Sequence, residues 1–216
     1  MQTNQAQKAS AGGRPTREEA EERGRRLLDI AQRHFLADGY LATSLDDIAG
    51  EAGIAKKTLY AHYGSKTGLF TAIVDRIRDT WISELRGIVL LSTSPEQVLQ
   101  AVGLHLLDVG TRPDMIALYR LFLAEARRFP GLTRSNYDEH GAPRGMEPLL
   151  AYFRKAASDG ILKIDDVALA TEQFTSLVLA GIRERLLANA TPRPSVRERN
   201  RIARQAVRLF LLGCKA

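Results

Sequence analysis

The sequence predicts an all-α protein. Apolar residues recur at three- and four-residue spacing through most of the 216 residues, as they do on one face of a helix. Capping residues precede these stretches, and glycine or proline follows them. The chain is 44% hydrophobic and 26% charged, which is typical of a globular protein with one or two small domains.

The first predicted helix begins after Thr16 and runs to about Asp38. Thr16 and Glu19 have the T-x-x-E spacing of a capping box, and Gly39 is expected to end the helix. His34 adjoins the apolar side of this helix, so we expect a packed histidine rather than a metal ligand. The residues expected on the buried side are Leu27, Leu28, Ile30, Ala31, His34 and Phe35.

Residues 1–15 are predicted to form a disordered basic arm, because they are polar and have no periodicity. Lys8 and Arg14, with Arg17 just after the arm, leave two readings open. The segment is either a solvated tail or an arm that reaches into a minor groove of DNA.

Residues 43–63 have the pattern of a helix-turn-helix. Ser44 is expected to cap the first helix, with Asp47 at the capping-box position. Gly53 suits the turn, because glycine adopts the left-handed conformation of a helix end without steric cost. Small Ala49 allows the two helices to cross closely, and Leu59 is expected to fill the space between them.

The second helix of this pair, Lys56–Tyr63, carries side chains suited to DNA. Lysines and hydroxyls at its start can meet phosphates and base edges, and a helix fits the major groove. Ser65 is expected to cap the next helix, where Lys66 adds an ammonium group at a helix N-terminus. Residues 53–70 contain three lysines and no acidic residue, although most of the net charge of +6 lies after residue 90. Other three-helix domains also have glycine turns and surface lysines, but spacing, capping and aromatic residues together favour a DNA-reading head.

The stretch from Thr43 to Phe70 resembles the DNA-binding domain of the tetracycline-repressor (TetR) family of bacterial regulators. The residues that carry the resemblance are Gly39, Tyr40, Thr43, Ile48, Ala49, Ala52, Gly53, Thr58, Leu59, Tyr60, His62, Tyr63, Ser65, Lys66, Leu69 and Phe70. The resemblance implies an all-helical homodimer with a small DNA-binding domain and a larger ligand-binding and dimerisation domain. It places at DNA-contacting positions Ser44, Lys56, Lys57, Thr58, Tyr60, His62, Tyr63 and Lys66. Lys57 replaces the small residue that the family often has there, so base preference does not transfer.

A long connecting helix is predicted from Lys66 to Leu91. At 1.5 Å per residue it would extend roughly 37 Å from the DNA-reading helix into the rest of the chain. Further helices are predicted over residues 96–109, 114–129, 146–158, 167–187 and 196–213. The predicted domains are residues 16–65, which read DNA, and residues 66–216, which bind ligand and dimerise and include the connecting helix 66–91.

A hydrophobic pocket is expected between the helices of the larger domain. Its candidate lining residues are Met115, Phe122, Glu125, Phe129, Tyr137, Met146 and Phe153, each apolar one of which also suits an ordinary core. A buried carboxylate needs a partner, so Glu125 either pairs with a nearby arginine or orients a ligand. Residues 120–132, with Tyr137, also resemble the C-terminal domain of the AefR-like branch of the TetR family.

The last two predicted helices are candidates for a dimer interface. The helix 167–187 is apolar nearly all round and therefore needs burying neighbours on both sides. The helix 196–213 has an arginine-rich outer face, which we interpret as a solvated face and dimer rim rather than a second DNA site. The candidate interface residues are Phe174, Leu177, Val178, Gly181, Ile202, Ala206 and Phe210. Two helices from each subunit would form a four-helix interface of the kind the family uses.

No catalytic or metal-binding motif competes with this reading. The chain has no H-E-x-x-H, no glycine-rich phosphate loop and no G-x-S-x-G, so no cofactor, metal or enzymatic activity is predicted. The single cysteine, Cys214, excludes an internal disulfide and is consistent with a reducing cytoplasm. No apolar run approaches the roughly 18 residues of a membrane span.

The sequence therefore predicts a cytoplasmic, sequence-specific DNA-binding regulator, most simply a repressor released from a palindromic operator by an effector. Its expected partners are double-stranded DNA, a second copy of the chain and a hydrophobic small molecule, with no membrane. The first alternative is a DNA-binding regulator without an effector. The second is a small helical enzyme or carrier protein.

Overall fold

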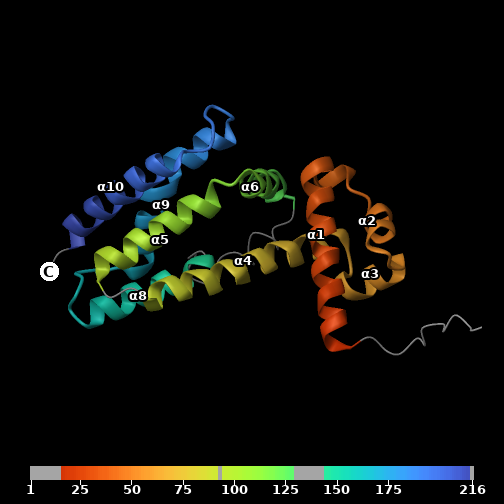
Figure 1. Cartoon of the computed structure of the whole chain (residues 1–216), viewed down its shortest axis with the longest axis horizontal. Helices are drawn as coiled ribbons and strands as arrows, with labels where there is room; N and C mark the ends of the chain where they lie inside the picture. The colour runs from red at the N-terminus through yellow and green to blue at the C-terminus, as the bar shows by residue number, and fades with distance from the viewer. Residues whose placement is uncertain (1–15, 92–93, 129–143, 215–216) are drawn as a thin grey trace, which may run out of the picture.

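The computed structural model describes residues 16–91, 94–128 and 144–214, and all regular structure in these ranges is helical, as predicted (Figure 1). The predicted arm, Phe129 and Tyr137 lie outside the described residues. No helix in the described ranges is long and apolar enough to cross a membrane. The elements are α1 (Arg17–Ala42), α2 (Leu45–Ala52), α3 (Lys56–Tyr63), α4 (Lys66–Leu91), α5 (Pro95–Gly110), α6 (Pro113–Glu125), η1 (Arg144–Met146), α8 (Glu147–Ser158), α9 (Val167–Leu187) and α10 (Val196–Cys214).

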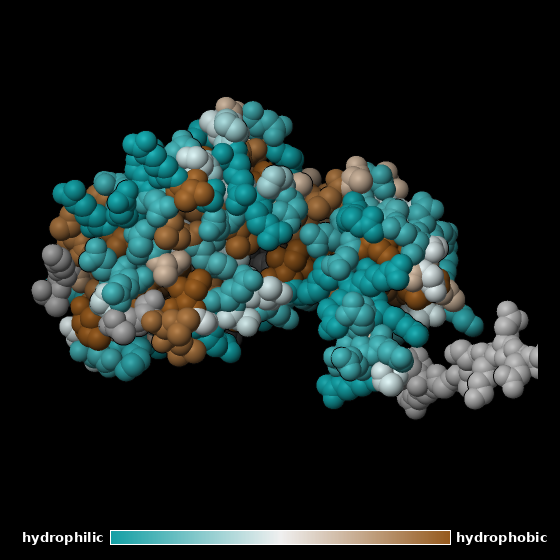
Figure 2. Space-filling model, viewed as in Figure 1, coloured by the Kyte–Doolittle hydropathy of each residue, from teal (hydrophilic) through white to brown (hydrophobic). Residues whose placement is uncertain are grey.

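The apolar side chains gather into two hydrophobic cores. The head core joins α1, α2, α3 and the start of α4, and its largest fully buried side chains include Phe35, Ile48, Leu59 and Phe70. The body core joins α5, α8, α9 and α10 to the far part of α4 through Leu85. Figure 2 shows hydrophobic patches on the visible surface of the body. The visible surface of α1 is largely hydrophilic.

The long helix α4 belongs to both cores. Leu69, Phe70 and Ile73 are fully buried in the head, and Leu85 is fully buried in the body. The helix has the bounds predicted from the sequence and 26 residues, which corresponds to about 39 Å. In Figure 1 it runs from beside α1 into the body, so it is the element shared by the two parts.

Helix α6 extends the body onto the head. Leu118 of α6 is buried in the head core, and Leu121 and Phe122 pack against it. At the other side, the Arg120 guanidinium donates to the carbonyl oxygen of Leu187 at the end of α9, at 2.8 Å. The helix therefore connects α1 to the end of α9.

Three predicted helix ends differ from the structure. Gly39 breaks the helical geometry with φ 77°, but the assigned helix α1 continues to Ala42. Helix α6 ends at Glu125 rather than Phe129, and residues 126–128 form a turn. The helix predicted from residue 146 begins with the short η1, and α8 follows with Pro148 in its first turn, where proline is well tolerated.

The first turn of α4 requires a glycine at position 68. A Cβ built at Gly68 would overlap the backbone carbonyl oxygen of Tyr63 at the end of α3 and lie 3.1 Å from the carbonyl carbon. Main-chain atoms cannot rotate away as a side-chain tip can. The contact therefore fixes the distance between α3 and α4.

We expect Gly68→Ala to destabilise the protein by about 1–3 kcal/mol, because the added methyl group overpacks a backbone contact. Gly24→Ala in α1 is the matched control, since nothing lies within 4 Å of its Cβ and alanine favours a helix by about 0.5–1 kcal/mol. Urea unfolding followed by circular dichroism measures both changes. Equal midpoints for the two variants would show that the α3–α4 contact is loose.

Candidate nucleic-acid interface

Helices α2 and α3 form the predicted helix-turn-helix. Gly53 adopts a left-handed conformation (φ 66°, ψ 33°) and ends α2, so its predicted role is confirmed. Ile48 and Ala49 of α2 and Leu59 of α3 are buried in the head core. Leu59 is the one buried side chain of α3; Thr58 and Tyr63 are half-buried, and the rest of this eight-residue helix is exposed.

The start of α2 is capped by Ser44. Its hydroxyl oxygen accepts from the backbone N–H groups of Asp46 and Asp47, at 3.2 and 3.3 Å. The described residues show no return bond from the Asp47 carboxylate, so the predicted capping box is only half formed. Ser44 is half-buried and its oxygen is already engaged, which leaves its hydroxyl hydrogen for another acceptor.

The exposed side of α3 carries Lys57, Tyr60 and His62. Tyr60 is 42% exposed, and Thr58 beside it is half-buried. Ala55 precedes α3 and provides no side-chain cap, so the first N–H groups of the helix have no side-chain acceptor. Free N–H groups at a helix start favour an anion such as phosphate.

The three lysines near α3 differ in their surroundings. Lys56 forms an ion pair with Asp46 at 2.7 Å, and Asp46 raises the pKa of Lys56. No ion-pair partner for Lys57 occurs among the residues that the structure describes. Lys66 donates to the carbonyl oxygen of Leu41 at 2.9 Å and lies over the ring of Tyr40. Lys57 is therefore the lysine most available to DNA.

Two of the predicted contact residues face inward. Tyr63 packs partly against the head core, and burial raises the pKa of its phenol. Burial also lowers the pKa of Lys66, and the nearby carboxylate of Glu125 acts in the opposite direction. Glu125 itself is 9% exposed, so the end of α6 places a buried negative charge near the start of α4.

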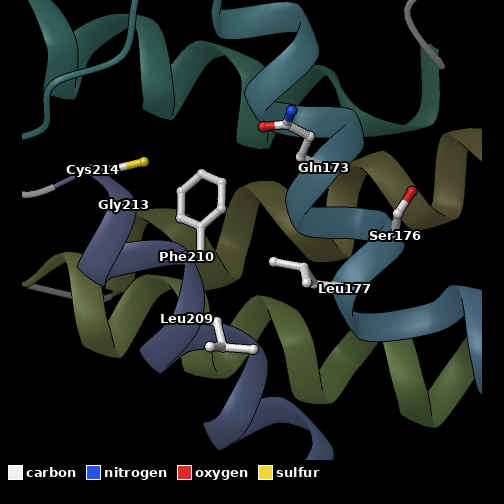
Figure 3. Close-up of a pocket in the computed structure, with 7 residues that line it drawn as sticks. All are labelled: Gln173, Ser176, Leu177, Leu209, Phe210, Gly213 and Cys214. Atoms are coloured by element: carbon white, nitrogen blue, oxygen red, sulfur yellow. The ribbon is translucent and has the colours of Figure 1, made fainter.

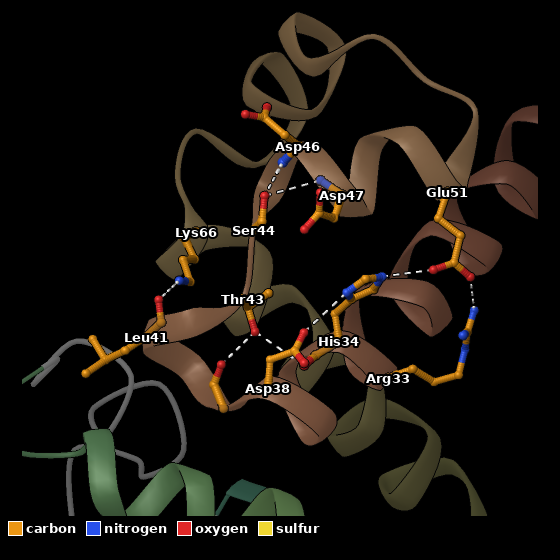
Figure 4. Close-up of polar contacts among 11 residues, drawn as sticks. Arg33, His34, Asp38, Leu41, Thr43, Ser44, Asp46, Asp47, Glu51 and Lys66 are labelled. Carbon is orange, nitrogen blue, oxygen red and sulfur yellow. Dashed lines mark hydrogen bonds and ion pairs between the residues drawn. The ribbon is translucent and has the colours of Figure 1, made fainter.

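A polar network joins α1 to α2 and corrects the expected role of His34 (Figure 4). Instead of packing against apolar side chains alone, His34 forms contacts with Glu51 at 2.9 Å and Asp38 at 3.5 Å. Arg33 also contacts Glu51, at 2.6 Å. Arg33 and His34 both lower the pKa of Glu51, so this carboxyl group stays ionised.

Sequence reasoning missed two contacts that position α3 through its neighbours. The hydroxyl groups of Tyr40 and Thr67 are 2.8 Å apart and join the end of α1 to α4. Gly68 was also missed. A glycine three residues after a helix-capping serine was the only signal for it in the sequence, and that signal does not distinguish a close contact from a tolerated glycine.

The candidate pocket residues do not gather around one described cavity. Met146 and Phe153 are buried in the body core, whereas Phe122 packs against the head core. Met115 is half-buried at the start of α6 and Glu125 is buried at its end. Phe129 and Tyr137 lie outside the described residues, so the pocket stays a prediction.

The candidate dimer residues divide between the core and the surface. Phe174, Val178, Ala206 and Phe210 are buried in this chain's own core, because α9 packs against α5, α8 and α10, and α10 packs against α5 and α9. Gly181 and Leu177 are exposed, and Ile202 is half-buried.

An apolar groove of about 550 Å³ opens between the outer faces of α9 and α10 (Figure 3). Leu177 and Leu209, both about half exposed, lie on opposite sides of it. The groove is lined by Gln173, Ser176, Leu177, Leu209, Phe210, Gly213 and Cys214.

Two family models match the chain. The one described as "Bacterial regulatory proteins, tetR family" matches residues 27–73, which include α2, α3 and the Gly68 contact. The one described as "AefR-like transcriptional repressor, C-terminal domain" matches residues 97–213, more than half of the chain. Within the described residues, no group of acidic, histidine or cysteine side chains could hold a metal ion.

Similar proteins are also transcriptional regulators. The activator FasR of Mycolicibacterium smegmatis is 37% identical over 97 residues, and the match spans only 44% of each chain. A TetR-family regulator from Mesorhizobium loti superimposes with a TM-score of 0.82 at 27% identity, over 94% of this chain and 100% of that one. The flavonoid-responsive regulator FrrA gives 0.66 at 26% identity, over 88% and 97%.

The family models cover both the helix-turn-helix and the body, and the solved structures share the whole arrangement of helices. The chain therefore belongs to the TetR family of bacterial transcriptional regulators.

Proposed function

We propose that the protein is a sequence-specific DNA-binding regulator that reads a palindromic operator with α3. The observation that carries this proposal is the exposed side of α3, where Lys57 lies at an uncapped helix start and Tyr60 and His62 follow along the helix. A helix of this size fits the major groove, and its free N–H groups suit phosphate. Repression is the simplest regulatory outcome, and the description of the body's family model as a repressor domain supports it.

A second copy of the chain is the proposed occupant of the α9–α10 groove. Leu177 and Leu209 are 45% and 50% exposed there, and contiguous apolar surface of this kind marks an interaction site. A twofold dimer would present two copies of α3 to two half-sites separated by whole turns of DNA. A twofold dimer formed through this groove would therefore explain why the operator is expected to be palindromic.

A hydrophobic small-molecule effector is the third part of the proposal. The rings of Trp81 of α4 and His105 of α5 pack at a tilt of 44°, with centroids 4.9 Å apart, and burial lowers the pKa of His105. Within the described part of the chain, the buried Trp81 Nε1 has no hydrogen-bond partner, whereas His105 Nε2 lies 3.4 Å from a carboxylate oxygen of Glu84. An unpaired buried donor calls for a missing partner, and an acceptor group on an effector would provide one beside the helix that leads to the head.

Removal of the Lys57 ammonium is expected to weaken operator binding on the order of tenfold. The slope of log affinity against log salt concentration should fall by about one, because one lysine that neutralises a phosphate is lost. We would titrate Lys57→Ala onto labelled DNA from upstream of its own gene, across a salt series, with random DNA as competitor. Lys155→Ala on α8 is the control, because it removes a lysine from the body. Tyr60→Ala is expected to weaken binding as well. Wild-type binding by both α3 variants would contradict the assignment of α3 as the reading helix.

Leu177→Glu and Leu209→Glu are each expected to convert a dimer into a monomer, because a carboxylate buried at an apolar interface has no partner. Light scattering after gel filtration gives the mass, and operator affinity should fall with it. Leu123→Glu, at an α6 residue that is 48% exposed, is the matched control. A wild-type chain that remains monomeric at micromolar concentration would refute the proposed interface.

The single tryptophan of the chain, Trp81, offers a direct reporter for effectors. A compound that binds beside it should change the tryptophan emission and release operator DNA over the same concentration range. Because FrrA is a flavonoid-responsive regulator, a flavonoid panel is the first to test. Trp81→Phe should need more compound for release while binding DNA normally. Release that is identical in this variant would place the effector elsewhere.

A further inference from the structure

His34 lies between two carboxylates where α1 meets α2 (Figure 4). Its Nε2 is 2.9 Å from Oε2 of Glu51, and its Nδ1 is 3.5 Å from Oδ2 of Asp38. The side chain of His34 is only 21% exposed, and Glu51 is also held by Arg33. Each ring nitrogen of His34 thus faces a carboxylate. Arg33 and His34 share the carboxylate of Glu51.

This arrangement suits a protonated imidazole. A neutral imidazole has one N–H donor and one nitrogen lone pair, so it can donate to Glu51 or to Asp38 but presents its lone pair to the other carboxylate. An imidazolium donates to Glu51 and also brings its positive charge to 3.5 Å from the Asp38 carboxylate. Histidine side chains change charge between about pH 5 and 8, a range in which Glu51 remains ionised because Arg33 and His34 lower its pKa.

The position of the contact connects it to DNA reading. Glu51 is in the last turn of α2, two residues before Gly53, where the chain turns into α3. Phe35, next to His34 on α1, packs in the same head core as Ile48 of α2. The contact between His34 and Glu51 therefore holds the C-terminal end of α2, just before α3, against α1. It lies outside the apolar contacts that join the same two helices.

We propose that His34 and Glu51 are positioning residues for operator binding, and that they hold α2 to α1 more firmly when His34 carries a proton. The inference rests on the proposed reading of DNA by α3. A proton on His34 would add a charge to the hydrogen bond with Glu51, and charged hydrogen bonds are stronger than neutral ones.

The test compares operator affinity of the full-length wild type and His34→Gln from pH 6 to pH 8 at constant ionic strength. Glutamine can still hydrogen-bond to Glu51 but gains no charge. We expect wild type to bind about three- to tenfold more tightly than the variant near pH 6, with the ratio falling toward one near pH 8. His62 on α3 is present in both proteins, so the ratio cancels its titration. Lys155→Ala, which removes an exposed ion pair on α8, should follow the wild-type profile.

A ratio that does not change with pH would overturn the proposal, and Glu51→Gln should flatten the wild-type profile as His34→Gln does. If His34→Gln does not fold, Asp38→Asn takes its place, because it removes only the more distant carboxylate. If wild-type protein binds no operator at any pH, the proposed function fails instead. The thermal midpoints of wild type and variant across the same pH range then decide whether the His34 contact strengthens in acid.

Discussion

The burial of α4 in two hydrophobic cores is the constraint on which the rest of the structure depends. Leu69, Phe70 and Ile73 are fully buried at one end and Leu85 at the other, and full burial of each such side chain contributes roughly 1.5–3 kcal/mol. Neither end can leave its core without losing several of these contributions. A movement of α4 in the body must therefore move the head core or disrupt it.

Helix α3 depends on α4 for its position. An isolated helix of eight residues is too short to be stable in water, and α3 buries only Leu59 fully. Its remaining support is the backbone contact between Tyr63 and Gly68, together with the Gly53 turn from α2. The helix can thus leave most of its surface open to DNA, because its place is determined by neighbours with larger cores.

The sequence predicted the local elements well, because their signals are local. Helices α3 and α4 begin and end at the predicted residues. The signals that set these bounds are Gly53, the cap at Ser65 and the apolar spacing, and each acts within one or two helical turns. Contacts between residues that are distant in the sequence were harder to predict. The spacing around His34 indicates a partly buried residue but does not show Glu51, which is 17 positions away. Periodicity likewise shows that Phe174 and Phe210 are buried, but not that this chain's own helices bury them.

Helix α6 explains how an event in the body can reach the head by a second route. Its Leu118 is in the head core, and its Arg120 binds the end of α9, the helix beside the proposed dimer groove. Glu125, at the end of α6, influences Lys66 at the start of α4. An effector changes DNA affinity only if it binds one arrangement of these helices more tightly than another. Since α4 and α6 both enter the head core, any ligand that separates them in the body must act on the same apolar side chains that position α3.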